Sequence, residues 1–244
     1  MNFSIVLPSS GNKQQILKML SSFERTTRYK DKIEFLIAID EGNSRIIADV
    51  PRGTFSFDIT FFERPKTKDF TNDYYNWLAD RSTGKNIMVF NDDAWMRTQD
   101  WDAKILREIA DSRWSIYCLD IPDTARMKYK HTFPCFPCVS SRAFCTLGFV
   151  LCKDIKMYPA DKVTFAIYEN AQRVIPIRNV MIEHEHVVET DESKKHMYEA
   201  FLEDHKNKAN VDISDYVYKI LLAGQSDIKR FGKLRRIINI IKEK

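Results

Sequence analysis

Glycine and proline are scarce in this sequence, with 7 and 8 copies among 244 residues. Collagen-like repeats and low-complexity linkers are excluded, because both depend on these two residue types. No apolar run reaches the roughly 18 residues that a membrane-spanning helix requires. The apolar stretch SIVLP near the start is too short for a secretory leader and runs into polar residues. We therefore expect a globular protein that resides in the cytoplasm.

Cysteine occurs an odd number of times, five, which argues against a disulfide framework. Cys135, Cys138, Cys145 and Cys152 follow the spacing C-x2-C-x6-C-x6-C. A structural zinc site is one interpretation, although the second CxxC pair of common zinc sites is missing. Cys145 and Cys152 lie among apolar residues, which favours the alternative of buried free thiols.

Charge of one sign is not in large excess: the net charge is +4, with 44% hydrophobic and 30% charged residues. Such a composition is typical of a folded domain. The basic residues concentrate in the C-terminal stretch IKRFGKLRRIINIIKEK, where apolar residues recur at helical spacing. A basic amphipathic helix of this kind contacts an anionic membrane or nucleic acid, or packs its apolar face on its own domain. The packed arrangement is the commoner one.

Apolar runs alternate with helical patterns in the first half of the chain. Strands are predicted at residues 3–8, 33–40, 57–63, 87–90 and 114–120, and helices at 13–27, 70–84 and 101–112. Asn12 is the expected N-cap of the first helix. The second has Phe70, Tyr74, Trp77 and Leu78 on its inward face and ends at Gly84. The alternation predicts a doubly wound, largely parallel sheet with helices on both faces.

The second half is less regular. Residues 131–144 are predicted to form a covering loop, 160–174 a helix, and 175–188 extended chain. From residue 191 onward the pattern is helical. The economical division is one core at residues 1–190 and a helical C-terminal extension at 191–244 packed on it.

Polar residues follow three of the predicted strands: Ser9, Asp40, and the run from Asn91 to Asp93. In open sheets of this kind, ligands lie beyond the carboxyl ends of the strands. Two adjacent carboxylates there either close a turn or share a divalent cation. The coincidence of three polar strand ends favours the ligand interpretation.

Several motifs occur in a telling order: IVLPSSGN, IAIDEGNS, Asn76 eight residues before Gly84, IMVF followed by NDD, a helix start at Asp161, and VIPIRNVMIEHEH. Over residues 1–186 their order and spacing resemble the GT-A fold glycosyltransferases, in particular the large inverting family. The resemblance implies a GT-A-like doubly wound mixed sheet with a Rossmann-like nucleotide-binding half.

The resemblance also implies site residues. Asp93, at the last acidic position of the family's D-x-D motif, would bind Mn²⁺ or Mg²⁺ together with His184, with His186 as the alternative ligand. A solvent-facing His184 in the EHEH run remains equally open. The nucleotide sugar would contact Pro8, Ser9, Asp40, Asn76, Asn91 and Asp92. Asp40 would accept from the base imide, unless it only forms a turn.

Asp161 matches the family's catalytic acidic position and would deprotonate the acceptor, although a carboxylate at a helix start is also favoured by the helix dipole. Two departures matter. Asn91 stands where the family usually has aspartate, and Tyr75 where many relatives have arginine. Diphosphate contacts would then come from Arg64, Lys66 or Lys68, unless these are simply solvated.

The implied function is metal-dependent transfer of a sugar from a nucleotide sugar, with a UDP-sugar favoured, and with inversion. The Q-x-x-R-W motif of processive synthases is absent, which favours single transfers. The acceptor would be a glycan, a lipid-linked sugar or a hydroxylated DNA base, with the basic C-terminal helix on a membrane or on nucleic acid. The alternative is a non-catalytic nucleotide- or nucleic-acid-binding module with a structural zinc at the cysteine loop.

Overall fold

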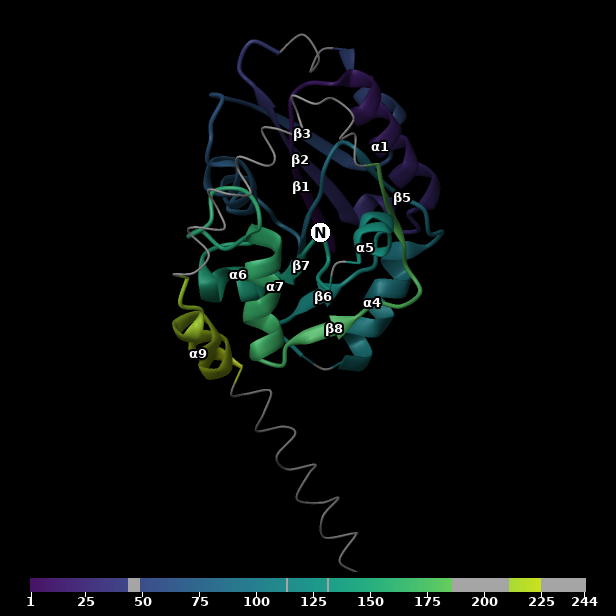
Figure 1. The fold of residues 1–244 in the computed structure, drawn as a ribbon. Helices are drawn as coiled ribbons and strands as arrows, with labels where there is room; N and C mark the ends of the chain where they lie inside the picture. The colour runs from purple at the N-terminus through teal and green to yellow at the C-terminus, as the bar shows by residue number, and fades with distance from the viewer. Residues whose placement is uncertain (44–48, 113, 131, 186–210, 225–244) are drawn as a thin grey trace, which may run out of the picture.

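The computed structural model describes residues 1–43, 49–112, 114–130, 132–185 and 211–224 (Figure 1). The basic C-terminal stretch, residues 191–210 of the predicted helical extension and the alternative ligand His186 lie outside these ranges.

The central element is a seven-stranded sheet with the order β3-β2-β1-β4-β7-β6-β8. Its strands are β1 (Phe3–Ser9), β2 (Ile33–Asp40), β3 (Asp58–Arg64), β4 (Asn86–Val89), β6 (Cys118–Asp120), β7 (Cys138–Ser140) and β8 (Val174–Pro176). The first four strands run parallel, β7 is antiparallel to both β4 and β6, and β6 is parallel to β8. The predicted mixed, doubly wound sheet is therefore confirmed.

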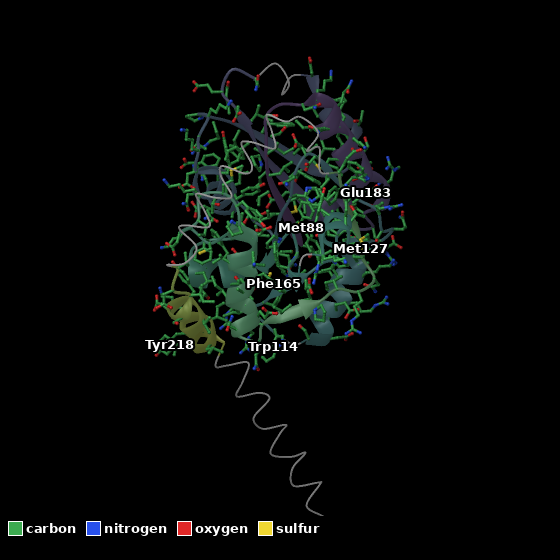
Figure 2. The ribbon with its side chains drawn as sticks, viewed as in Figure 1. Met88, Trp114, Met127, Phe165, Glu183 and Tyr218 are labelled. Atoms are coloured by element: carbon green, nitrogen blue, oxygen red, sulfur yellow. The ribbon has the colours of Figure 1, made fainter. Side chains whose placement is uncertain are left out.

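The sheet is covered on both faces, as the unbroken apolar strands predict. Alternate residues of β1 and β2 point to opposite sides, so that Phe3 and Phe35 enter one core and Val6 and Leu36 the other. Helices α1 (Lys13–Thr26) and α4 (Trp101–Ser112) cover the first face; α3 (Trp77–Ala79), α6 (Ser141–Leu147) and α7 (Ala160–Asn170) cover the second. Figure 2 shows Met88 of β4 inside these layers.

Helix α1 begins as predicted, because the Asn12 side chain accepts a hydrogen bond from the backbone N–H of Gln15 at 3.3 Å. The single-turn 3-10 helices η1 (Lys30–Lys32) and η2 (Arg52–Thr54) lie before and after β2.

The helix predicted at residues 70–84 differs in form and length. It begins as a π-helix, η3 (Thr71–Asn76), continues as α3 and ends at Asp80. Tyr74 and Leu78 are buried as expected. Gly84 does not terminate the helix; a Cβ there would lie 2.5 Å from the backbone nitrogen of Ser4, so glycine allows the chain to approach β1.

The second half is more structured than predicted. Strand β7 and helix α6 occupy part of the expected loop, and helix α5 (Thr124–Tyr129) follows β6. The extended segment after α7 forms two separate strands, β8 and β9 (Ile182–His184). Strand β9 pairs antiparallel with β5 (Ala94–Met96), which lies directly after the NDD run. This pairing brings His184 to the end of β4.

Helix α9 (Ser214–Ala223) is the described part of the C-terminal extension and packs against α6 and α7 (Figure 1). The Tyr216 ring lies 5.0 Å from that of Phe149, and its hydroxyl donates to Asp154 at 2.6 Å. Tyr218 of the same helix points to solvent (Figure 2). Across the described ranges, none of the helices has the length and apolar character needed to span a bilayer.

Candidate active site

A cavity of about 530 Å³ opens at the carboxyl ends of β1, β2 and β4. Its lining includes seven residues predicted from the sequence: Pro8, Ser9, Asp40, Asn91, Asp92, Asp93 and Asp161. The parallel arrangement of these strands explains the convergence, because their carboxyl ends lie at one edge of the sheet.

Asp92 is held by the last residue of the neighbouring strand β1. Its carboxylate accepts a hydrogen bond from the Ser9 hydroxyl, which itself accepts from the backbone N–H of Gly11 at 3.1 Å. Burial raises the pKa of Asp92, the Ser9 hydrogen bond opposes this, and the neighbouring Asp93 charge raises it further. The cavity lining therefore includes a carboxylate whose negative charge is poorly solvated.

Asp93 faces His184, with 3.5 Å between Oδ1 and Nε2. The pairing of β5 with β9 sets this distance, since Ala94 is the partner of His184 and the Glu185 N–H donates to the Asp93 carbonyl at 3.0 Å. The His184 side chain is only 5% exposed. Asp93 Oδ1 is buried and accepts no hydrogen bond from any residue in the described ranges.

This pair fits a divalent cation. Neighbouring ligands of an octahedral cation lie about 3 Å apart, close to the observed separation. The buried, unbonded Oδ1 of Asp93 supplies a hard oxygen ligand, and the imidazole supplies nitrogen. Asp93 and His184 come from segments more than ninety residues apart, and the structure brings them together as the sequence motif implied.

Asn91 is oriented by Tyr75. The Tyr75 hydroxyl donates to Asn91 Oδ1 at 2.5 Å. Burial raises the pKa of Tyr75, and the charges of Asp93, Asp92 and Asp161 raise it further, so the hydroxyl remains a donor. In the sequence, Tyr75 stood out only because many members of the GT-A family have arginine at this position.

Asp40 is held in a similar way by Tyr74, whose hydroxyl donates to Asp40 Oδ1. The pKa of Tyr74 is raised to about 12, first by burial and then by the hydrogen bond to Asp40 and the negative charge of Asp40. Tyr74, which was predicted on the inward face of this helix, thus also lines the cavity, with its hydroxyl bonded to Asp40.

Asn76 does not line the cavity. Its Oδ1 accepts from the backbone N–H groups of Val150 and Leu151 at 2.9 and 3.0 Å, and its Nδ2 donates to the Leu151 carbonyl at 2.9 Å. Because Leu151 is a lining residue, Asn76 fixes a wall of the cavity instead of reaching into it.

Asp161 lies in the first turn of α7 and also lines the cavity. Its Oδ1 accepts from the backbone N–H of Lys162 at 2.7 Å. Of the basic residues suggested for the diphosphate, Lys66 lines the cavity. Arg64 instead donates to the Asp73 carbonyl at 3.2 Å and lies 4.1 Å from the Trp77 ring.

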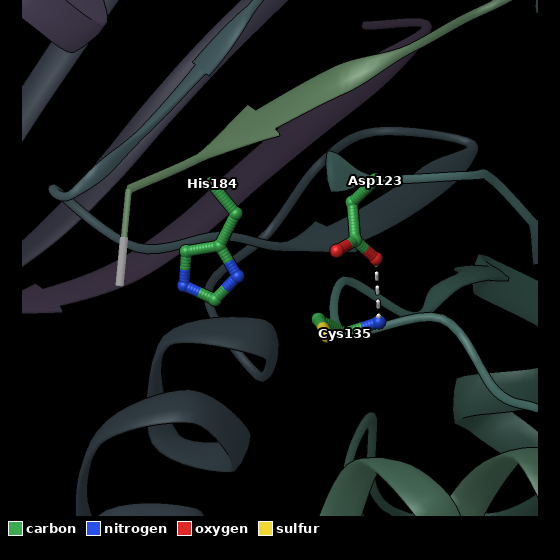
Figure 3. Close-up of side chains that lie close together, drawn as sticks. All are labelled: Asp123, Cys135 and His184. Carbon is green, nitrogen blue, oxygen red and sulfur yellow. Dashed lines mark hydrogen bonds between the residues drawn. The ribbon is translucent and has the colours of Figure 1, made fainter. Parts of the chain in front are cut away.

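The four cysteines suggested for zinc are dispersed. Cys138 and Cys152 are buried, whereas Cys145 is exposed on α6. Within the described part of the chain, the group of close metal-ligating atoms contains only one of them, Cys135, together with Asp123 and His184 (Figure 3). A zinc site made of the four cysteines is therefore not formed.

Solved structures of other proteins share this architecture. Residues 1–349 of S. aureus TarS in complex with UDP match with a TM-score of 0.59 and 13% identity, over 91% of this chain and 70% of that one. The mannosyltransferase PcManGT from Pyrobaculum calidifontis, in complex with GDP-Man and Mn²⁺, gives a TM-score of 0.65, 12% identity and coverage of 95% and 75%. GalNAc-T7 with UDP, GalNAc and Mn²⁺ matches with a TM-score of 0.57 and 9% identity, over 93% of this chain and 55% of that one.

The fold is that of the GT-A glycosyltransferases. At these identities the likeness establishes the fold alone. No protein-family model matches the sequence, and no curated protein matches it.

Proposed function

We propose that this chain is a metal-dependent glycosyltransferase that moves a sugar from a UDP-sugar to an acceptor hydroxyl, with inversion and in single transfers. The observation that carries the proposal is the charge of the cavity: Asp40, Asp92, Asp93 and Asp161 line it together with Lys66. A diphosphate would be repelled by four carboxylates unless a cation joined them. The position of the cavity at the carboxyl ends of the parallel strands, where ligands of open α/β sheets usually bind, supports the proposal.

Asp93 and His184 are the residues that would hold the cation. When bound, a divalent cation neutralises the charge that develops on the departing diphosphate. We expect Mn²⁺ to support binding better than Mg²⁺, because Mg²⁺ prefers an all-oxygen set and one ligand here is imidazole.

The nucleotide would be oriented by groups that the protein already holds in place. Asp40, fixed by Tyr74, would accept from the imide N–H of uracil. Asn91 has its Oδ1 occupied by the Tyr75 hydroxyl, so its Nδ2 offers two N–H donors to the ribose or the diphosphate.

Asp161 would act as the general base. The acceptor hydroxyl oxygen attacks the anomeric carbon, the bond from that carbon to the diphosphate oxygen breaks, and Asp161 takes the hydroxyl proton. Asp161 lines the same cavity as Asp93, so the acceptor and the donor would meet in one site.

Calorimetric titration tests the proposal, with UDP and GDP each added in Mn²⁺ and in EDTA. We expect UDP to bind in Mn²⁺ and to lose most of its affinity in EDTA. Slow Mn²⁺-dependent hydrolysis of one UDP-sugar, in a panel that includes GDP-sugars, would then identify the donor. UDP binding that is equal in EDTA would contradict metal dependence, and binding without hydrolysis of any donor would favour the non-catalytic module.

The acceptor requires a second assay with the identified donor. Candidate acceptors are glycans, lipid-linked sugars in anionic vesicles and DNA with hydroxylated bases. A steep loss of DNA binding with added salt would accompany a DNA acceptor, because phosphate contacts release counterions.

A further inference from the structure

Asp123, Cys135 and His184 form a compact cluster beside the cation pair. One ligand atom from each lies within 4.8 Å of the others (Figure 3). Asp123 is fully buried, the His184 side chain is 5% exposed, and Cys135 is partly exposed to the cavity that it lines. The predicted catalytic machinery uses His184 but neither Asp123 nor Cys135.

The three residues come from different segments that are bonded to one another. The Thr124 hydroxyl accepts from the His184 N–H at 2.9 Å and donates to the His184 carbonyl at 3.4 Å. Asp123 caps α5 by accepting from the Arg126 N–H at 2.8 Å, and its other oxygen accepts from the Cys135 N–H at 3.3 Å. The cluster is therefore held in place by hydrogen bonds between the side chains of Asp123 and Thr124 and the backbone of the other segments.

The imidazole of His184 has two sides with different neighbours. Its Nε2 lies 3.5 Å from Asp93. Figure 3 shows the other ring nitrogen, Nδ1, turned toward Asp123 and Cys135. The same ring thus borders the proposed Mn²⁺ position on one side and a carboxylate with a thiol on the other.

We propose that Asp123, Cys135 and the Nδ1 of His184 form a second metal site, selective for a thiophilic divalent cation such as Zn²⁺, whose occupation prevents His184 from binding the Mn²⁺ beside Asp93. The site itself is independent of the enzymatic activity, whereas the antagonism rests on the function proposed above.

The ligand set suits zinc. Sulfur, nitrogen and oxygen are the atoms that bind Zn²⁺, and three protein ligands with one open position are typical of accessible zinc sites. Ligand atoms around tetrahedral Zn²⁺ lie about 3.5 Å apart, so separations within 4.8 Å need to contract by at most about 1.3 Å. Cys135 lines the cavity, which provides an entry path and room for water as the fourth ligand.

The charges around the cluster are compatible with a cation. Each oxygen of Asp123 accepts one backbone hydrogen bond, and the carboxylate also accepts a hydrogen bond from the Cys135 thiol, whose proton a cation would replace. The positive charge of Arg126, which acts on the cluster, is paired with Asp120. On binding, the Cys135 thiol releases its proton to solvent, since the thiolate is the ligand.

The antagonism follows from the chemistry of a neutral imidazole, which carries one N–H and one lone pair. When the lone pair of Nδ1 binds Zn²⁺, the proton resides on Nε2. The Nε2–H then donates toward Asp93 and cannot serve as a metal ligand. Zn²⁺ and Mn²⁺ consequently demand opposite tautomers of His184.

Co²⁺ added to the metal-free full chain tests the site directly, because a cobalt–thiolate bond absorbs in the near ultraviolet. We expect this absorption to saturate at one equivalent and to disappear in Cys135→Ser. Cys145→Ser is the matched control, since Cys145 is exposed on α6, and it should retain the absorption. No absorption in the wild type, or an unchanged one in Cys135→Ser, would overturn the proposal.

Zn²⁺ competition tests the antagonism. Saturation with Zn²⁺ should weaken Mn²⁺-dependent UDP binding by roughly 5- to 150-fold, the usual range of coupling between two sites. In Cys135→Ser the effect of Zn²⁺ should be largely lost; an undiminished effect would place the inhibitory zinc elsewhere and overturn the antagonism. Cobalt–thiolate absorption without any Mn²⁺-dependent UDP binding would support the site and refute the proposed function. Normal UDP binding without the absorption would refute the site alone.

Discussion

The Tyr75 hydroxyl donates a hydrogen bond to Asn91 Oδ1 at 2.5 Å, linking the π-helix η3 to the first residue of the NDD run after β4. This contact decides which end of the Asn91 amide faces the cavity. With Oδ1 occupied, the Nδ2 donors are directed to the ligand. An aspartate at position 91 would add a third carboxylate next to Asp92 and Asp93. Asn91, oriented by Tyr75, instead supplies N–H donors and adds no negative charge.

Tyr75→Phe should therefore weaken Mn²⁺-dependent UDP binding. The substitution removes the hydrogen bond and leaves the amide free to turn, so we expect affinity to fall roughly tenfold, which corresponds to about 1.4 kcal/mol. Stability should fall by about 1 kcal/mol, the usual net value of one hydrogen bond. Calorimetry and urea unfolding measure the two effects.

Tyr117→Phe is the matched control. The buried Tyr117 hydroxyl makes the same kind of contact, to Asn86 Oδ1 at 2.6 Å, but neither residue lines the cavity. We expect a similar loss of stability with unchanged UDP affinity. Equal affinity losses in the two variants would show that Tyr75 acts through general stability and not by orienting Asn91.

Asp93→Ala should abolish Mn²⁺-dependent UDP binding while the fold remains intact. The variant loses the hard oxygen ligand that lies 3.5 Å from His184. Removing one of several crowded carboxylates should not lower the melting temperature of the metal-free protein. Asp80→Ala is a suitable comparison, because the Asp80 side chain is 75% exposed and lies away from the cavity. UDP affinity equal to wild type in folded Asp93→Ala would remove Asp93 from the metal site.

The strand ends were visible in the sequence because apolar runs followed by Ser9, Asp40 and NDD obey a local pattern. Parallel strands then bring such residues to one edge, so the polar residues at the strand ends that line the cavity could be predicted. The β5–β9 pairing could not, since strands of three residues show no period-two pattern. The resemblance to the GT-A family supplied His184 instead.

Hydrogen-bond partners were the least predictable part of the site. Asn76 was expected to contact the nucleotide, but its side chain is occupied by the backbone at Val150 and Leu151. Asp123 carries no sequence signal, because its neighbours Cys135 and His184 are 12 and about sixty residues away and meet only through tertiary contacts. Such contacts depend on loops whose path no local pattern determines.

Asp161→Asn should bind UDP with Mn²⁺ as the wild type does but transfer sugar roughly 10² to 10⁴ times more slowly, the usual cost of losing a general base. The asparagine Oδ1 can still accept from the Lys162 N–H, so the start of α7 should be preserved. Single-turnover transfer to the true acceptor is the decisive measurement. A rate close to wild type would leave Asp161 with only a role at the helix start.

Gly84 was predicted from the sequence to end a helix, but the structure gives a different reason for glycine at this position. A helix-ending glycine is usually required by a positive φ, and Gly84 is not among the residues with positive φ. It is required by space: an added Cβ would lie 2.5 Å from both the backbone nitrogen and the hydroxyl oxygen of Ser4. The same hydroxyl accepts from the Gly84 N–H at 2.7 Å and donates to Glu34 at 2.5 Å.

Gly84→Ala should consequently push the chain away from β1 and disturb both hydrogen bonds. We expect the free energy of unfolding to fall by about 1–3 kcal/mol, as for overpacking in a core. Gly53→Ala is the matched control, because no atom lies within 4 Å of a Cβ at Gly53 and its φ is not positive. Its stability in urea should be unchanged or slightly raised, since alanine restricts the unfolded chain. If both variants unfold at the same urea concentration as the wild type, the close approach of Gly84 to Ser4 is not what requires glycine at this position.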